Sequence, residues 1–370
     1  MNYNTLDPWS SLDNLLEEGR RLEVYTAAAA VVGLEGELQW EGVVGWVSRN
    51  LQAPEVTPET VFDLASLTKP LATALALMVL AARGNITLDT SLGEVIQEEW
   101  LPPDKRGLTI RLLLAHQAGL PAWRPFYPQI LAAPETERAG LAPRLAAATP
   151  LEYSPGTQTL YSDLGYMLLQ AVAETASGRD LDAFCREEIY LPLGLPGLGF
   201  CPRNQPGGDS LSYAATEEGL IPGRNVSGEV HDENAWAAGG VAGQAGLFGN
   251  VREVFQLLSI LYRVYQEETV RPLIPEVVRA FLTPVAADGR TPGFDTPGTD
   301  RLLCSAGRFF SAASVGHLGF TGTSFWLDLE LGQMVVLLTN RVHLGRDDKS
   351  KIQRFRPKLH EKASKILGIL

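Results

Sequence analysis

Ser66 and Lys69 stand three residues apart at the start of a long apolar run. The surrounding sequence, TVFDLASLTKPLATALALMVLAARG (residues 60–84), predicts a helix, because its interior is Leu, Ala, Met and Val and Gly84 provides a C-terminal stop. Side chains three positions apart share a helical face, so the Ser66 hydroxyl and the Lys69 amine are expected to touch. Burial at the positive end of a helix favours a neutral amine, which can take the proton of the serine. The pair therefore predicts an activated nucleophile.

A serine at a helix start can also be an ordinary cap, and a Ser-x-x-Lys match can arise by chance. A capping serine, however, needs no lysine three positions later in an otherwise uncharged run. We therefore favour the nucleophile interpretation of Ser66.

A second group of residues lies in YSPGTQTLYSDLGYMLL, where Tyr161 and Asp163 precede another apolar helical run. A tyrosine that projects into a cleft beside a lysine can be held partly as phenolate. It can then accept the proton of the attacking nucleophile and give a proton to the leaving group. The alternative is a packing tyrosine followed by a capping Asp163.

The third group lies in GHLGFTGTSFW (residues 316–326), where His317 stands at the entry of a predicted strand. Glycines such as Gly319 let a substrate backbone approach closely. The backbone amide of Phe320 could pair with that of Ser66 to bind an oxyanion, an interaction usually worth about 3–4 kcal/mol. The alternative is a histidine in a glycine-rich turn.

These residues must be positioned by elements from both ends of the chain. Residues 10–21 predict a helix, and the apolar runs at 27–47 and 316–340 each predict a hairpin. The middle of the chain shows short helical patterns between Pro- and Gly-rich loops, and residues 284–300 suggest a surface loop. The basic segment at 349–365 predicts a solvated C-terminal helix.

The predicted fold class is α/β (α+β), with one antiparallel sheet built from the N- and C-terminal segments and flanked by helices. Residues 1–84 and 246–370 form this sheet domain, and residues 85–245 form an inserted, mainly helical domain. The cleft between the two is the expected site.

Composition limits the possible functions. A net charge of −12 over 370 residues argues against a nucleic-acid partner, which would need clustered Lys and Arg. No uninterrupted run of 18 apolar residues predicts a membrane span, and the N-terminus carries no signal-peptide pattern. Cys185, Cys201 and Cys304 are too few and too scattered for a disulfide framework or a metal site. We therefore expect a cytoplasmic protein with no membrane partner, metal or organic cofactor.

Taken together, the segments FDLASLTKPLAT, LLLAHQAGLP, YSPGTQTLYSDLGYMLL, GGVAGQAGLFGNV and GHLGFTGTSFWLD resemble the β-lactamase-related serine hydrolases. That group includes class C β-lactamases, penicillin-binding proteins and β-lactamase-fold esterases. The resemblance covers roughly residues 20 to 345. It implies that Ser66 is acylated, that Lys69 is its proton partner and that Tyr161 is the general base. It also places His317 and Gly319 at the family's Lys-Thr-Gly triad, as His-Leu-Gly.

Two departures bear on the substrate. Asp163 replaces an asparagine and favours a charged Lys69. His317 and Leu318 replace a fixed cation and a hydroxyl that would hold a substrate carboxylate. With the acidic net charge, these changes lead us to expect repulsion of anionic β-lactams and a preference for neutral esters.

GEVHDENAWAAGGVAGQAGLF (residues 228–248) is also similar to bacterial amidases that cut lactyl-peptide bonds in muramyl peptides. His231 and Asp232 there are interpreted mainly as a loop scaffold, with substrate orientation or ion binding as the alternative, and His116 in LLLAHQAGLP as structural. The sequence thus predicts a serine hydrolase acting on a small ester, amide or muramyl peptide. A carboxylesterase is the first choice, and the alternatives are an amidase or D-amino-peptidase, a weak β-lactamase, or an inactive penicillin- or peptide-binding module.

Overall fold

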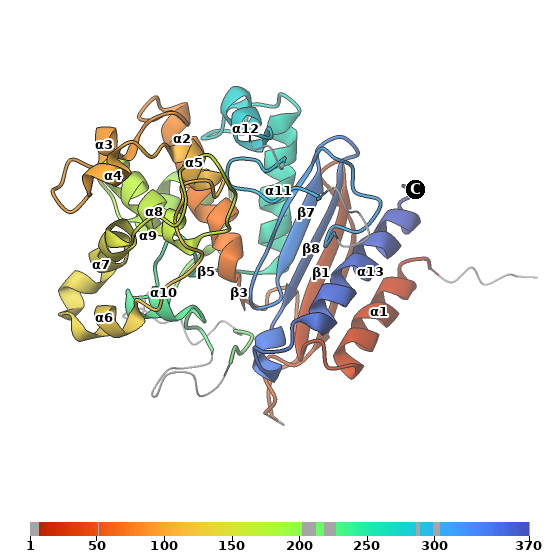
Figure 1. Ribbon diagram of the computed structural model, residues 1–370. Coiled ribbons are helices and arrows are strands. Elements are labelled where there is room, and N and C mark those ends of the chain that lie inside the picture. Colours follow the sequence, from red (N-terminus) through yellow and green to blue (C-terminus); the bar gives the residue numbers. More distant parts are fainter. Residues whose placement is uncertain are drawn as a thin grey trace, which may run out of the picture.

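The computed structural model describes residues 7–50, 52–201, 212–217, 227–285, 289–298 and 304–369. Its main sheet has five antiparallel strands in the order β2-β1-β8-β7-β6. The strands are β1 (Ala27–Leu34), β2 (Glu37–Gly45), β6 (Ser314–Leu318), β7 (Ser324–Asp328) and β8 (Gln333–Thr339). Both predicted hairpins, β1–β2 and β7–β8, are confirmed. The sheet joins the two ends of the chain where β1 pairs with β8 (Figure 1).

Helices cover both faces of this sheet because its strands are apolar on both sides. On one face, α1 (Ser10–Arg21) and α13 (Ser350–Ile366) bury an apolar cluster against β1 and β8. On the other, α11 (Val251–Tyr265) lies between the sheet and the helical part (Figure 1). The remaining helix of this layer, α12 (Pro275–Leu282), packs on α11.

The helical part lies beside the sheet, on the side of α11 (Figure 1). Its helices are α3 (Leu92–Val95), α4 (Pro103–Arg106), α5 (Ile110–Leu114), α6 (Tyr127–Ala132), α7 (Glu135–Ala148), α8 (Asp163–Ser177), α9 (Leu181–Cys185), the π-helical η3 (Arg186–Tyr190) and α10 (Glu233–Ala237). A small sheet of β3 (Phe62–Asp63), β5 (Leu247–Gly249) and β4 (Gly199–Phe200) lies at its base.

The segment that carries Ser66 is helical throughout but not α-helical throughout. It begins as the 3₁₀ turn η1 (Ala65–Leu67), widens into the π-helical η2 (Lys69–Ala74) and ends as α2 (Leu75–Ala82). Gly84 follows with a positive φ of 75°, as expected of a helix stop. The window Ala65–Ala82 is long and apolar enough to span a membrane, but 83% of it is buried in the protein, as in a core helix.

Two details differ from the sequence-based expectation. His317 lies near the end of β6 rather than at its entry, because the strand already begins at Ser314. The C-terminal helix α13 is not simply solvated, since it buries Arg356 and His360 together with its apolar face. The predicted loop at 284–300 lies partly outside the described residues.

Candidate active site

Ser66 and Lys69 meet as their spacing predicts. The Lys69 Nζ donates to Ser66 Oγ at 3.1 Å and to the carbonyl oxygen of Gln244 at 3.0 Å. The same Nζ lies 2.7 Å from Asp163 Oδ1. The Lys69 side chain is completely buried, whereas that of Asp163 is 18% exposed.

The ion pair decides the charge of Lys69. Burial alone would lower the pKa of Lys69, but the Asp163 carboxylate and Tyr161 together raise it above its ordinary value. The expectation of a neutral amine, based on burial, is therefore wrong. The expectation that Asp163 favours the charged form agrees with the geometry.

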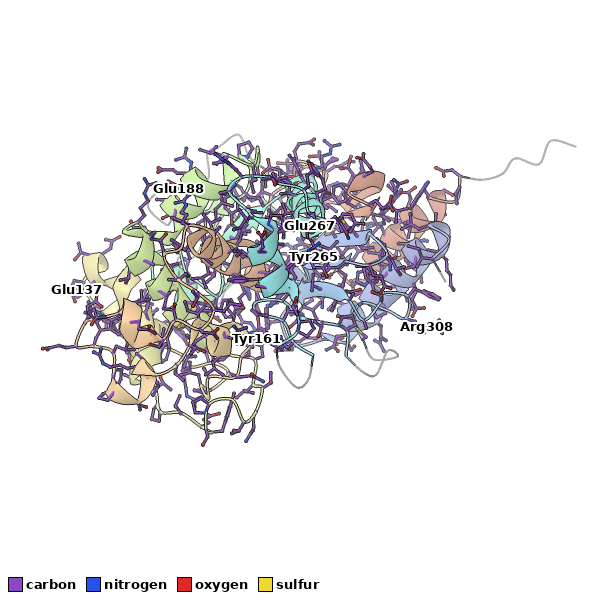
Figure 2. The ribbon with its side chains drawn as sticks, turned by 90° about the horizontal axis from the view of Figure 1, so that it is seen from above. Glu137, Tyr161, Glu188, Tyr265, Glu267 and Arg308 are labelled. Carbon is purple, nitrogen blue, oxygen red and sulfur yellow. The ribbon has the colours of Figure 1, made fainter. Side chains whose placement is uncertain are left out.

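Tyr161 lies next to this pair, at the boundary between the helical part and the sheet (Figure 2). Its ring centroid is 5.0 Å from Lys69 Nζ. Burial raises the pKa of Tyr161, although Lys69 and a hydrogen bond with Ser66 act in the opposite direction. The net shift is upward, so the predicted phenolate character is not supported for the free protein. Tyr161 is a neutral phenol that contacts both Ser66 and Lys69.

His116 holds the segment that carries Tyr161, in agreement with its structural interpretation. It adopts the left-handed conformation, with φ = 58°, and its Nδ1 accepts a hydrogen bond from the backbone amide of Ser162 at 3.0 Å. Its ring lies 4.5 Å from that of Tyr161. Burial lowers the pKa of His116 well below its ordinary value, so the ring is a neutral support.

His317 approaches from the sheet side, with its ring centroid 5.9 Å from that of Tyr161. Its Nδ1 lies 3.0 Å from the carbonyl oxygen of Leu318. Because a carbonyl only accepts, Nδ1 carries the proton, and Nε2 is an acceptor in the neutral ring. Burial lowers the pKa of His317 to about 4, with further lowering from Lys69, so the ring is neutral at pH 7. Nε2 is buried and has no partner among the described residues.

The turn after β6 is tied to the segment that precedes Ser66. The hydroxyl of Thr323 donates to the Leu64 carbonyl oxygen at 3.1 Å, and a Cβ on Gly319 would lie 2.0 Å from that hydroxyl oxygen. Only glycine fits there, and Phe320 follows it in the turn. Phe320 is 37% exposed.

A cavity of about 310 Å³ joins these groups. Its lining includes Ser66, Tyr161, His317, Gly319 and Phe320 among the predicted residues. Leu318, from the same His-Leu-Gly segment, also lines it, and the rest of the lining was not predicted and comprises Asp295, Arg341, Lys349, Ile352, Gln353 and Arg356. The structure therefore brings the three predicted groups together and adds a wall from the C-terminal segment.

His231 and Asp232 lie beside this cavity and not in it. The His231 backbone amide donates to Asp63 Oδ2 at 2.7 Å, and its Nε2 lies 2.9 Å from Glu217 Oε2. Asp232 caps α10 by accepting from the Ala235 amide at 2.7 Å. These bonds agree with the scaffold interpretation. Among the described residues, no group of three or more His, Cys, Asp or Glu side chains is placed to hold a metal ion.

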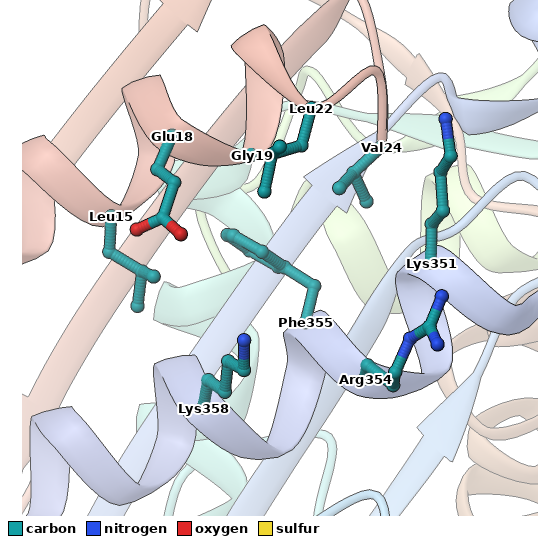
Figure 3. A pocket seen from close by; sticks show the side chains of 9 residues that line it. All are labelled: Leu15, Glu18, Gly19, Leu22, Val24, Lys351, Arg354, Phe355 and Lys358. Atoms are coloured by element: carbon teal, nitrogen blue, oxygen red, sulfur yellow. The ribbon is translucent and has the colours of Figure 1, made fainter.

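A separate hollow lies between α1 and α13 (Figure 3). Its apolar floor includes Phe355, and Lys351, Arg354 and Lys358 stand at its side. These residues lie on the opposite face of α13 from those that line the Ser66 cavity.

Comparison with known proteins gives a consistent result. The sequence model of the family described as Beta-lactamase matches residues 12–356. A "Putative D-alanyl-D-alanine carboxypeptidase" of Escherichia coli K12 is 33% identical over 320 residues, which cover 81% of this chain and 73% of that protein. An N-acetylmuramyl-L-alanine amidase of Bacillus subtilis is 30% identical over 344 residues, covering 86% and 78%.

Among solved structures, the octameric penicillin-binding protein homologue from Pyrococcus abyssi superposes with a TM-score of 0.72 at 19% identity. The match covers 97% of this chain and 77% of that one. The likeness concerns the fold, and it agrees with the predicted sheet flanked by helices.

Proposed function

The chain belongs to the Beta-lactamase family of serine hydrolases, and from this premise we propose that it hydrolyses an amide bond through an acyl-enzyme on Ser66. The observation that carries the choice of an amide is the buried Nε2 of His317. A buried acceptor without a donor is costly, by roughly 1–3 kcal/mol, so a bound substrate is expected to supply one. The N–H of an amide can do so, and the alkoxy oxygen of an ester cannot.

The proposed chemistry keeps Lys69 charged. Ser66 Oγ attacks the carbonyl carbon, and its proton passes to the phenol oxygen of Tyr161 as Tyr161 gives its own proton to the leaving nitrogen. The neutral phenol therefore relays a proton without a net change of charge, which suits its raised pKa. The Lys69 cation stabilises negative charge that develops on the phenol oxygen.

The backbone amides of Ser66 and Phe320 are proposed to bind the oxyanion, because both residues line the cavity. Water then attacks the acyl-enzyme, and the relay through Tyr161 returns a proton to Ser66. In this proposal Asp163 is the counterion of Lys69. Gly319 is the residue whose small size allows close approach between its turn and the substrate backbone.

Two relatives support amide substrates. Their names, a "Putative D-alanyl-D-alanine carboxypeptidase" and an "N-acetylmuramyl-L-alanine amidase", both refer to the cleavage of amide bonds. We therefore propose a peptide or muramyl-peptide substrate. We also propose a cytoplasmic location, supported by three buried, unpaired cysteines.

Repulsion of anionic substrates by like charges in the cleft no longer favours neutral esters, because Asp163 is paired with Lys69 and the cavity is lined by Arg341, Lys349 and Arg356. Ester hydrolysis remains the competing outcome in the test.

The test compares an amide and an ester that share one acyl group, N-acetylmuramyl-L-alanine and the p-nitrophenyl ester of N-acetylmuramic acid. His317→Ala is expected to reduce kcat/KM for the amide by at least about tenfold more than for the ester, because only the amide donates to Nε2. Ser66→Ala, as the control, should abolish both reactions. Equal losses on the two substrates, or turnover of the ester alone, would refute the choice of an amide.

A further inference from the structure

Two arginines line the Ser66 cavity without an ion pair to any carboxylate in the described part of the chain. Arg341 belongs to the 3₁₀ turn η4 (Arg341–Leu344) after β8, and Arg356 belongs to α13. They are 4% and 5% exposed. Arginines at this depth are normally paired with an acid, because burial of an unpaired charge is unfavourable.

Within the described residues, the hydrogen bonds of these two arginines go to backbone oxygens. Arg356 Nη2 donates to the carbonyls of Gly319 at 3.2 Å and Thr323 at 2.9 Å. Arg341 Nε donates to the carbonyl of Phe320 at 3.1 Å, and its Nη1 has longer contacts, of 3.3–3.4 Å, with two further carbonyls. Arg356 Nε and Arg341 Nη2 are buried and, in the described part of the chain, have no acceptor.

The nearby acids are occupied elsewhere. Glu217 accepts from Arg346 Nε at 2.6 Å, and Asp295, which lines the cavity, is paired with Arg290. Burial lowers the pKa of Arg356, and Arg341 lowers it further, as expected of two cations that share one site. Burial lowers the pKa of Arg341, and Glu217 and Asp348 oppose that shift only in part, while Asp348 Oδ1 accepts from the Ser350 amide at 2.8 Å. No described carboxylate forms a direct ion pair with Arg341 or Arg356.

A third cation completes the wall. Lys349 and Arg356 are seven residues apart, and Ile352 and Gln353 between them line the same cavity, so one face of α13 points toward Ser66. Lys349 Nζ lies 4.7 Å from the ring centroid of Phe320, and the guanidinium of Arg341 lies 5.1 Å from the same ring. Three cations therefore surround one end of the cavity, next to the proposed oxyanion donor.

We propose that Arg341, Lys349 and Arg356 form a subsite for a carboxylate of the substrate, and that this carboxylate supplies the missing counterion. The inference rests on the proposed function in that the substrate is a peptide amide. The His-Leu-Gly segment of β6 offers no fixed cation, so the charge that selects an anionic substrate comes from the C-terminal segment. Two guanidinium N–H groups without acceptors match the two oxygens of a carboxylate.

The experiment uses two substrates with the same scissile bond, N-acetylmuramyl-L-alanine and N-acetylmuramyl-L-alaninamide, which differ by one carboxylate. The wild-type enzyme is expected to prefer the acid by about 10- to 100-fold in kcat/KM, the range of charge-assisted hydrogen bonds. Lys349→Gln and Arg356→Gln should each reduce this preference by about tenfold or more, mainly through KM. Arg354→Gln, on the opposite face of α13, is the matched control and should leave the preference intact.

The proposal is overturned if wild-type enzyme treats acid and amide alike, or if the preference persists in both variants. If neither substrate is cleaved, the proposed function fails. Binding of a carboxylate to the subsite is then measured separately, as inhibition of p-nitrophenyl acetate hydrolysis. N-acetyl-L-alanine should then inhibit at least tenfold better than N-acetyl-L-alaninamide, and Lys349→Gln should remove the difference. Inorganic phosphate that inhibits better than N-acetyl-L-alanine would assign the subsite to phosphate and refute the carboxylate.

Discussion

Lys69 and Arg356 are both buried cations beside the cavity that contains Ser66, but their surroundings differ. Lys69 contacts the Asp163 carboxylate at 2.7 Å, whereas the hydrogen bonds of Arg356 to described residues go to the carbonyl oxygens of Gly319 and Thr323. The charge of Lys69 is therefore compensated within the protein and is available for every turnover. The charge of Arg356 is left for a ligand to compensate, so it can distinguish one substrate from another.

The largest effect is expected when the compensated cation is removed. Lys69→Met should lower kcat/KM by more than about 10⁴-fold, as loss of one member of a catalytic unit does. It also leaves Asp163 without its partner, and breaking a buried pair typically costs about 3–5 kcal/mol; the partial exposure of Asp163 reduces this. Single-turnover acylation and urea unfolding measure the two effects. Rapid acylation in this variant would remove Lys69 from the mechanism.

Tyr161→Phe tests the relay that the compensated cation supports. Acylation should slow by about 10²–10⁴-fold, the usual contribution of a positioned acid or base, with little change in substrate affinity. Stopped-flow measurement of the acyl-enzyme gives both values. A change confined to affinity would make Tyr161 a binding wall.

Asp163→Asn makes the surroundings of Lys69 resemble those of Arg356. Burial then dominates, so the pKa of Lys69 should fall and kcat/KM should drop by about 10- to 100-fold. In the native protein, the raised pKa of Lys69 stabilises the folded state at pH values below 10.5, the ordinary pKa of the lysine side chain. This stabilisation is lost as the pH rises through the pKa that Lys69 has in the folded state. The variant lacks that contribution. Its deficit in unfolding free energy should therefore be largest near pH 7 and shrink above pH 10.

Arg356→Met tests the uncompensated cation, and its effect on stability should be the smallest. Because the native site holds a buried charge without a carboxylate, an apolar side chain of similar length should leave the free energy of unfolding unchanged or higher. Thermal unfolding measures this outcome in the ligand-free protein. A loss above about 3 kcal/mol would show that the two carbonyl bonds of Arg356 are essential to the turn.

The elements with local signals were predictable from the sequence. Helix α1 matches the predicted residues 10–21, and the β1–β2 and β7–β8 hairpins follow from alternating apolar runs around Gly-containing turns. The contact of Ser66 with Lys69 followed from helical spacing, although the segment is 3₁₀ and π-helical there. The division at residues 84 and 246 stays a prediction.

The charge states were harder to predict, because they depend on contacts between distant segments. Asp163 reaches Lys69 from another helix, and this contact together with Tyr161 outweighs the effect of burial. Burial likewise raises the pKa of Tyr161 and keeps its side chain a neutral phenol. Gln244, whose carbonyl oxygen accepts from Lys69, offers no side-chain signal at all.

The cationic wall left a signal in the sequence that the solvated-helix interpretation overlooked. Lys349, Ile352, Gln353 and Arg356 have the spacing of one helical face, which is the pattern of a helix that packs on something. Charged residues on such a face were attributed to solvent. The sequence alone does not show that Arg341 joins these residues, because Arg341 lies in a separate turn before the helix.

The pairing of β1 with β8 also governs the order in which the protein can mature. Ala28 pairs with Thr339, so β1 and β8 can pair only after residue 339 has been synthesised. The helical part is encoded between them and can collapse earlier, since domains fold as their residues emerge. Until β8 arrives, β1 presents an unpaired edge to other chains, which is a route to aggregation. Ser66 is therefore translated long before the strands that form the sheet-side wall of its site, and the complete site can assemble only after β6 to β8 have been synthesised.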